Sequence, residues 1–291
     1  MMLDEALKKR INNEIANATV KILFADDFRG SGVFISQDGY VLTAYHCIGE
    51  YAPPITIETR FGEQFKAELD EAKSLKHSDY DIAVLKIYDK ATHYLPLGII
   101  SSQNKGDKIM TTGYPAGDIK DNQELGIYFG NISKFRGNKI ENDAMKGRGH
   151  SGGLVYHYGT HRVIGLVTEG YKSNVMLNAG LATRFDALFE NWAELELINN
   201  KVTKAWDKRL LELGYGGSRS INQLHKPIFP FIVRKKALLE KRLENLQQRY
   251  DAVFTQCEAT LNEGDKFPLE MQLEQLEKQI EQTEKELSQL F

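Results

Sequence analysis

The chain has 291 residues, of which 42% are hydrophobic and 26% charged, so it can bury one or two cores and is unlike a disordered or fibrous protein. Its 37 basic and 40 acidic side chains give a net charge of −3, which argues against a nucleic-acid partner held by bulk charge. No apolar run approaches the ~20 residues that cross a bilayer, so no membrane partner is expected.

The first residues predict a charged amphipathic helix, placed at 1–17, followed by a strand. This helix lacks the apolar stretch of a secretory signal. The chain contains two cysteines, Cys47 and Cys257, which excludes a disulfide framework and every multi-cysteine metal site. We therefore expect a cytoplasmic protein with reduced thiols.

From residue 18 to residue 183 the sequence has the pattern of an all-β domain, which we bound at 18–190. Short alternating or β-branched runs recur, separated by Gly, Asp, Asn and Ser, and this spacing is typical of a sandwich or a barrel. No internal repeat is visible. The clearest runs lie at residues 20–23, 32–35, 40–43, 55–57, 82–85 and 163–167.

The pattern changes near residue 184. Residues 184–213 contain no Gly or Pro and repeat apolar residues at helical spacing, which predicts one or two helices. The Gly-rich stretch 214–218 ends them, and because it lacks the Gly-Lys-Ser/Thr ending of a phosphate-binding loop it is interpreted as a linker. We place the helical connector and linker at residues 191–230.

The last segment, residues 231–291, has apolar positions that step by four and three residues along two runs. A break at 262–268 that contains Gly and Pro separates the runs, so an antiparallel coiled-coil hairpin is predicted. Residues 231–250 carry six basic and two acidic groups, a net charge of +4, and residues 251–291 carry three basic and ten acidic groups, a net charge of −7. The two arms should attract each other. The hairpin either supports its own β domain or binds a second copy or a partner helix.

Three segments of the β domain carry side chains suited to acyl transfer. His46 follows a predicted strand, Asp81 precedes an Ile-Ala-Val-Leu run, and Ser151 lies in the sequence Gly-His-Ser-Gly-Gly at 149–153. Acyl transfer needs a nucleophile, a base, and an acid that orients the base. It also needs two N–H groups aimed at the oxyanion, which Gly149 and Ser151 can supply. Each segment alone is a weak signal, but their order across one β domain points to nucleophilic catalysis.

These segments resemble the trypsin-like (chymotrypsin-fold) serine peptidases in their bacterial HtrA/Deg-like form. The resemblance rests on the glycine-led hairpin before His46, the Asp81 segment, the connection at residues 95–117 and the loop around Ser151. It implies a mainly β fold, a double β-barrel with the site in the cleft between the barrels. It implies that His46 is the general base, Asp81 the orienting carboxylate and Ser151 the nucleophile, with an oxyanion hole at Gly149 and Ser151.

The same resemblance implies the substrate-binding residues. It places Met145 at the base of the pocket for the P1 side chain, and Thr168, Glu169 and Gly170 along its side. An uncharged Met at the base favours an apolar P1 residue over Arg or Lys. His150 departs from the Asp or Asn that the family usually has before the serine. The predicted hairpin takes the place of the PDZ domain that many HtrA-like enzymes carry, so PDZ-based peptide sensing and trimeric assembly are not carried over from the family.

Nearby residues of the same types have other interpretations. Asp81 is preferred to Asp79 because Asp81 directly precedes the strand. His157 and His161 flank a Tyr-Gly-Thr turn with no acidic or thiol residue near them in the sequence. We interpret these two as surface residues of a hairpin and not as zinc ligands.

The sequence thus predicts an intracellular serine endopeptidase that hydrolyses peptide bonds through an acyl-enzyme, without a metal or a cofactor. Its substrate is a protein or peptide, and residues 231–291 dock a regulatory protein or a second copy of the chain. The alternative is a catalytically silent, peptidase-like scaffold that acts through its coiled-coil hairpin.

Overall fold

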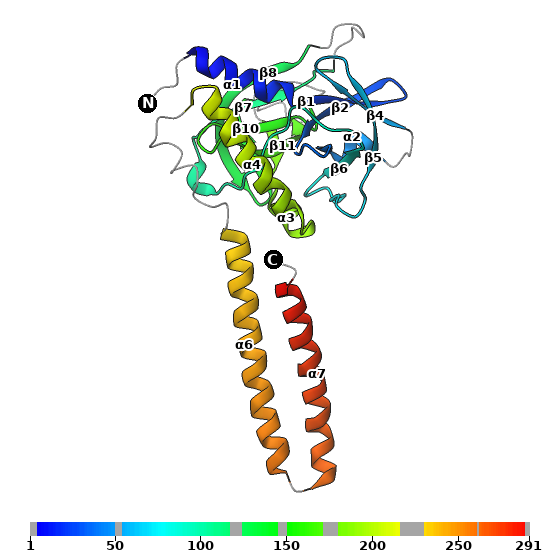
Figure 1. Ribbon diagram of the computed structural model, residues 1–291, viewed down its shortest axis with the longest axis vertical. Helices are drawn as coiled ribbons and strands as arrows, with labels where there is room; N and C mark the ends of the chain where they lie inside the picture. The colour runs from blue at the N-terminus through cyan, green and yellow to red at the C-terminus, as the bar shows by residue number, and fades with distance from the viewer. Residues whose placement is uncertain are drawn as a thin grey trace. The chain divides into compact units, whose positions relative to one another are not determined.

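The computed structural model describes residues 5–49, 54–116, 124–144, 150–170, 180–215, 230–260 and 262–288. The chain divides into two compact units, Met1–Leu224 and His225–Phe291. The first unit contains two closed β-barrels with helices, and the second is a helical hairpin (Figure 1). Among the described residues, no helix is long and apolar enough to cross a membrane.

The first barrel has six antiparallel strands in the order β1-β2-β3-β6-β5-β4. Strand β1 pairs with β4 and closes the barrel, so no strand edge is left unpaired. Alternation of apolar and polar residues specifies some strands clearly: in β4 every second residue is buried. The bounds are β1 Thr19–Phe24, β2 Asp27–Phe34, β3 Tyr40–Ala44, β4 Ile55–Thr59, β5 Gln64–Leu69 and β6 Ile82–Ile87, with the short helix α2 (Tyr45–Ile48) after β3.

The second barrel repeats this arrangement. Its strands follow the order β7-β8-β9-β12-β11-β10, and β10 pairs with β7 to close it. The two barrels therefore share one topology, as the double-barrel prediction requires, although the sequence has no visible repeat. The bounds are β7 Lys108–Gly113, β8 Gly126–Arg136, β9 Lys139–Asn142, β10 Leu154–His157, β11 Arg162–Gly170 and β12 Gly180–Thr183.

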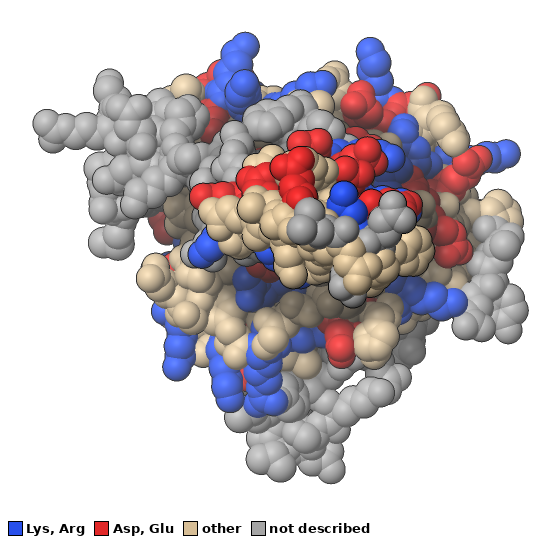
Figure 2. Space-filling view, turned by 90° about the horizontal axis from the view of Figure 1, so that it is seen from below, with Lys and Arg blue, Asp and Glu red and all other residues tan. Residues whose placement is uncertain are grey.

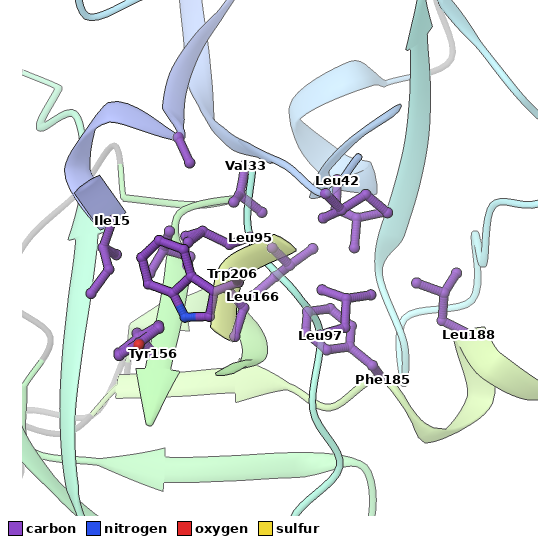
Figure 3. Packing of buried hydrophobic residues seen from close by; sticks show 14 of the residues in the cluster. Ile15, Val33, Leu42, Leu95, Leu97, Tyr156, Leu166, Phe185, Leu188 and Trp206 are labelled. Atoms are coloured by element: carbon purple, nitrogen blue, oxygen red, sulfur yellow. The ribbon is translucent and has the colours of Figure 1, made fainter. Parts of the chain in front are cut away.

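The largest hydrophobic core joins the two barrels to the helices (Figure 3). Helices α1 (Glu5–Asn17), α3 (Asp186–Asn191) and α4 (Leu195–Glu212) each add buried side chains to it. The predicted first helix and connector helices are thus present, and they hold the barrels together. Members of this core are Ile15, Val33, Leu42, Leu97, Tyr156, Leu166, Phe185, Leu188 and Trp206.

A buried ion pair ties the second barrel to α4. Arg162 Nη2 lies 2.9 Å from Asp207 Oδ1, and the two side chains are 3% and 8% exposed. Arg162 Nη1 also donates a hydrogen bond to the carbonyl of His161 at 3.0 Å. Both charges are thereby removed from water, and the attraction between them offsets the free energy lost with their hydration.

We expect Asp207→Ala to lower the free energy of unfolding by about 3–5 kcal/mol, because it leaves the Arg162 charge buried without its partner. Urea denaturation of the purified protein measures this loss. Arg209→Ala is the matched control on the same helix, since Arg209 pairs with Glu14 at the surface, and it should cost less than about 1 kcal/mol. Equal losses in the two variants would contradict the assignment.

The prediction that His157 and His161 lie on the surface is wrong, because both are buried. His157 Nε2 lies 3.0 Å from Asp107 Oδ2. His161 Nδ1 lies 3.0 Å from the Tyr156 hydroxyl. The His161 ring packs edge-on against Tyr215, with the ring centres 4.3 Å apart. Burial lowers the pKa of both rings, that of His161 to about 4. Tyr215 follows α4, and a contact so distant in sequence leaves no trace in the local pattern.

The second unit consists of α6 (Pro230–Ala259) and α7 (Glu263–Ser288), which pack against each other. Leu239, Leu246 and Leu276, which belong to the apolar positions that step by four and three residues, are buried. Tyr250 on α6 donates a hydrogen bond to Glu277 on α7 at 2.8 Å. The helical hairpin expected from the spacing is therefore present.

The break between these helices is shorter than predicted, since α7 begins at Glu263 and includes Pro268. Asn262 explains the earlier start. Its side-chain oxygen accepts the N–H of Gly264 at 3.0 Å, and its carbonyl accepts the N–H of Lys266 at 3.1 Å. Asn262 thus caps the first turn, which the Gly and Pro signals alone did not indicate.

Candidate active site

His46 and Asp81 are joined by two hydrogen bonds at the ends of neighbouring strands. His46 lies in α2 directly after β3, and Asp81 lies directly before β6, which pairs with β3. His46 Nδ1 lies 2.6 Å from Asp81 Oδ2, and the His46 backbone N–H donates to Asp81 Oδ1 at 2.9 Å. One carboxylate oxygen orients the ring and the other holds the backbone that carries it.

The backbone of Asp81 is itself fixed. Its φ of 54° lies in the left-handed region, which Asp tolerates better than most residues. Its N–H donates to the carbonyl of His77 at 2.9 Å, and its carbonyl accepts the N–H of Tyr45 at 3.1 Å. The Asp81 side chain is 13% exposed and that of His46 48%. A shielded carboxylate thus orients a ring that remains accessible, as a general base must be.

The hydrogen bond to Asp81 raises the pKa of His46 to about 10, with a further contribution from Cys47 that outweighs the lowering by burial. Because this pKa exceeds the ordinary value of 6.5, the interaction favours the protonated folded state. Its contribution to stability is complete below pH 6.5 and is lost as the pH rises through about 10. The imidazole becomes an unprotonated base over the same alkaline range.

The turn that carries Ser151 lies against the first barrel, although it belongs to the second. The Ser151 carbonyl accepts the N–H of Ser31 in β2 at 2.8 Å. The thiol of Cys47, the residue after His46, lies 3.6 Å from the same oxygen. The structure thus brings the Ser151 turn next to the His46 segment, from residues about a hundred positions apart.

Gly152 makes this close approach feasible. Its φ is 81°, and a Cβ at this position would overlap the Ser31 carbonyl and the Thr43 hydroxyl. Its N–H donates to the carbonyl of Val167 at 2.7 Å. The glycine after Ser151 therefore serves a conformation and a contact that any side chain would disturb.

Two predicted site residues, Gly149 and Met145, lie outside the described residues, so the oxyanion hole and the base of the P1 pocket stay predictions. Glu169 and Gly170 belong to β11, where they pair with Leu181 and Gly180 of β12. Only the backbone of Glu169 and Gly170 is described.

Thr168, the third residue predicted along the side of the P1 pocket, is buried. Its hydroxyl lies 3.3 Å from Lys139 Nζ and 3.3 Å from the Thr183 hydroxyl. Lys139 Nζ also donates to Thr183 Oγ1 at 2.7 Å. No sequence motif singles out Lys139 or Thr183, because they come from other strands of the second barrel.

His150, the departure from the family pattern, is buried beside the site. Its ring packs edge-on against Tyr128 of β8, with the ring centres 5.0 Å apart. Ser31 was also missed as a site residue, although it is buried and touches the Ser151 carbonyl. Its place between two glycines was the available signal. Within the described ranges, no group of three or more His, Cys, Asp and Glu side chains is arranged to hold a metal ion.

Comparison with known proteins agrees with this geometry. Residues 30–166 match the family described as a trypsin-like peptidase domain, and residues 232–290 match that described as effector-associated domain 9. Serine endoprotease DegS of Haemophilus influenzae is 33% identical over 132 residues, which cover 43% of this chain and 37% of that protein. A probable periplasmic serine endoprotease, DegP-like, of Rhizobium meliloti is 30% identical over 150 residues, covering 48% of this chain and 27% of that protein. The matches thus span well under half of the relatives' length.

Proposed function

We infer that this chain, which contains a trypsin-like peptidase domain, is a serine endopeptidase that hydrolyses peptide bonds. The observation that carries this proposal is the double hydrogen bond between His46 and Asp81 beside the Ser151 turn. An accessible imidazole, a shielded carboxylate and a hydroxyl on a glycine turn are the parts that acyl transfer requires.

The mechanism follows from the roles proposed for these groups. His46 takes the proton of Ser151 Oγ as Oγ bonds to the scissile carbonyl carbon, and the N–H groups of Gly149 and Ser151 stabilise the oxyanion. His46 then protonates the leaving amine, the C–N bond breaks, and the acyl-enzyme remains. Water attacks the ester carbon as it loses a proton to His46. His46 then gives this proton to Ser151 Oγ as the C–O bond breaks, which releases the carboxylic acid product and free Ser151. Asp81 orients the ring throughout and stabilises the imidazolium.

For the substrate we propose a protein or peptide with an apolar P1 side chain. The support is the uncharged Met145, proposed at the base of the pocket, with Thr168, Glu169 and Gly170 along its side. A peptide library varied at P1 tests this, and a preference for Arg or Lys would contradict it.

For the hairpin we propose docking of a regulatory protein or of a second copy of the chain. The support is the match of residues 232–290 to an effector-associated domain and the exposed side chains of Phe254, Phe267 and Met271. On the face drawn in Figure 2 the described residues carry both acidic and basic side chains, and the net charge of the chain is −3, which favours a protein partner over nucleic acid. Light scattering over a range of protein concentrations separates self-association from monomeric behaviour.

For the location we propose a reducing compartment such as the cytoplasm. The support is that Cys47 and Cys257 are both free and buried. Fractionation of the native cells tests this, and recovery of the chain from an oxidising compartment would contradict it.

Labelling with a fluorophosphonate probe tests the catalytic proposal. Such a probe reacts with a serine only when a base and an oxyanion hole activate it. We expect the full-length protein to be labelled and Ser151→Ala to remain unlabelled, as judged by gel fluorescence and intact mass.

A folded protein that stays unlabelled up to pH 9 would favour the alternative, a catalytically silent scaffold that acts through its hairpin. Labelling that persists in Ser151→Ala would show that another residue is the nucleophile. Circular dichroism of both proteins confirms that the comparison is between folded chains.

A further inference from the structure

The N–H, the carbonyl and the hydroxyl of Ser31 are all hydrogen-bonded, and two of these bonds join the two barrels at the Ser151 turn. Its N–H donates to the Ser151 carbonyl at 2.8 Å, and its own carbonyl accepts the Thr43 hydroxyl at 2.6 Å. Its hydroxyl accepts the backbone N–H of Tyr114 at 2.8 Å. Ser31 is fully buried, so these partners are not exchanged for water.

The first of these bonds fixes the peptide group that follows the nucleophile. The oxygen of the Ser151–Gly152 peptide is held by Ser31 of the first barrel. The N–H of the same peptide donates to Val167 of the second barrel at 2.7 Å. Because the peptide is planar, a clamp on both sides sets the rotation of the backbone at Ser151. That rotation helps to decide where Ser151 Oγ points.

Only the third bond depends on the Ser31 side chain. Its partner, Tyr114, directly follows β7, and β7 pairs with β10, the strand that follows the Ser151 turn. The Ser31 hydroxyl thus ties β2 to the strand that supports this turn. Tyr114 is buried, so removal of the hydroxyl leaves its N–H without this acceptor inside the protein.

We propose that Ser31 is a positioning residue for the nucleophile. Its hydroxyl holds the end of β7 against β2, in the position where the Ser31 N–H can donate to the Ser151 carbonyl. This inference rests on the proposed function and deepens it, because it assigns part of the serine's alignment to a side chain in the other barrel. A shift of about 1 Å in a reacting group slows a reaction by roughly 100-fold.

A second hydroxyl contact between the barrels provides the matched control. Thr19 Oγ1 in β1 lies 2.6 Å from Thr112 Oγ1 in β7, and both residues are buried. Thr19 does not bond to the Ser151 carbonyl: its hydroxyl pairs with Thr112 and with the carbonyl of Ile15. Thr19→Val therefore removes an inter-barrel hydrogen bond of the same kind without touching the clamp.

The experiment measures the rate constant of fluorophosphonate labelling, and kcat and KM on a peptide substrate, in the full-length chain. We expect Ser31→Ala to slow labelling and kcat by roughly 10- to 100-fold with KM within about twofold. Thr19→Val should keep both within about threefold. Urea denaturation reports the stability of each variant, so a change in rate is separated from partial unfolding.

Native-rate labelling of Ser31→Ala, or equal slowing in Thr19→Val, would overturn this inference and leave the proposed function intact. An unlabelled wild-type protein overturns both. Should Ser31→Ala not fold, Ser31→Cys measured under reducing conditions decides, since a thiol is a weak acceptor of similar size. Intermediate slowing in Ser31→Cys supports the inference, and native-rate labelling of this variant overturns it.

Discussion

Asp81→Asn should lower kcat by about 10,000-fold while the chain stays folded. Asn has the shape of Asp and tolerates the φ of 54° found at this position. An amide oxygen can still accept the backbone N–H of His46, which Asp81 Oδ1 accepts at 2.9 Å. The amide nitrogen, however, then donates to His46 Nδ1. That donation places the imidazole proton on Nε2. This is the nitrogen that must be unprotonated to accept the proton of Ser151 Oγ.

The pH dependence of this variant separates orientation from folding. The hydrogen bond to Asp81 is the largest cause of the raised His46 pKa, about 10. Wild-type labelling should therefore rise with pH through the alkaline range as His46 loses its proton. In Asp81→Asn the midpoint of the residual rate should move down toward the ordinary value of 6.5. Labelling rates measured between about pH 5 and about pH 11 give both midpoints.

Asp79→Asn is the control, because it changes a carboxylate two residues away. The Asp79 side chain is 73% exposed, and Oδ2 lies 3.4 Å from His77 Nδ1. We expect less than about a twofold change in kcat for this variant, in keeping with an exposed pair. Equal losses in the Asp79 and Asp81 variants, or a native rate in Asp81→Asn, would remove Asp81 from the proposed triad.

The strands and helices of this fold can be predicted from the sequence, whereas the contacts between segments distant in the sequence cannot. The alternation at Ile55 and Ile57 predicts a strand because one face of β4 is buried and the other half-exposed. In β2 the burial is continuous from Gly30 to Phe34, because this strand is covered by its own barrel and by the Ser151 turn. Periodicity is lost there, and with it the signal that the strand reaches another domain.

The same limit applies to the site. His46, Asp81 and Ser151 could be singled out because their neighbours along the chain identify them. Thr43 could not, and Ser31 could be noticed only through the glycines on either side of it, because what marks both residues is contact with residues of other strands. The ion pair between Arg162 and Asp207 likewise could not be predicted from the pattern of charges, since the two residues lie 45 positions apart.

Gly152→Ala should abolish fluorophosphonate labelling and destabilise the fold by several kcal/mol. Two effects combine at this position. The φ of 81° is strained for any residue with a Cβ, at a cost of about 1–2 kcal/mol. In addition, the new Cβ would overlap the Ser31 carbonyl and the Thr43 hydroxyl. To relieve the overlap, the Ser151 turn must move away from β2, which breaks the Ser31 bond to the Ser151 carbonyl.

Gly62→Ala separates strain from overlap, since Gly62 has a φ of 82° and nothing lies within 4 Å of a Cβ built there. This control should lose only the cost of strain and label at the native rate. Thermal unfolding and labelling of the three proteins make the comparison, and the difference between the variants reports the contact between the barrels. If Gly152→Ala were no less stable than Gly62→Ala and reacted normally, the Ser151 turn would not be seated against β2. Both the clamp and the proposed alignment of the nucleophile would then have to be abandoned.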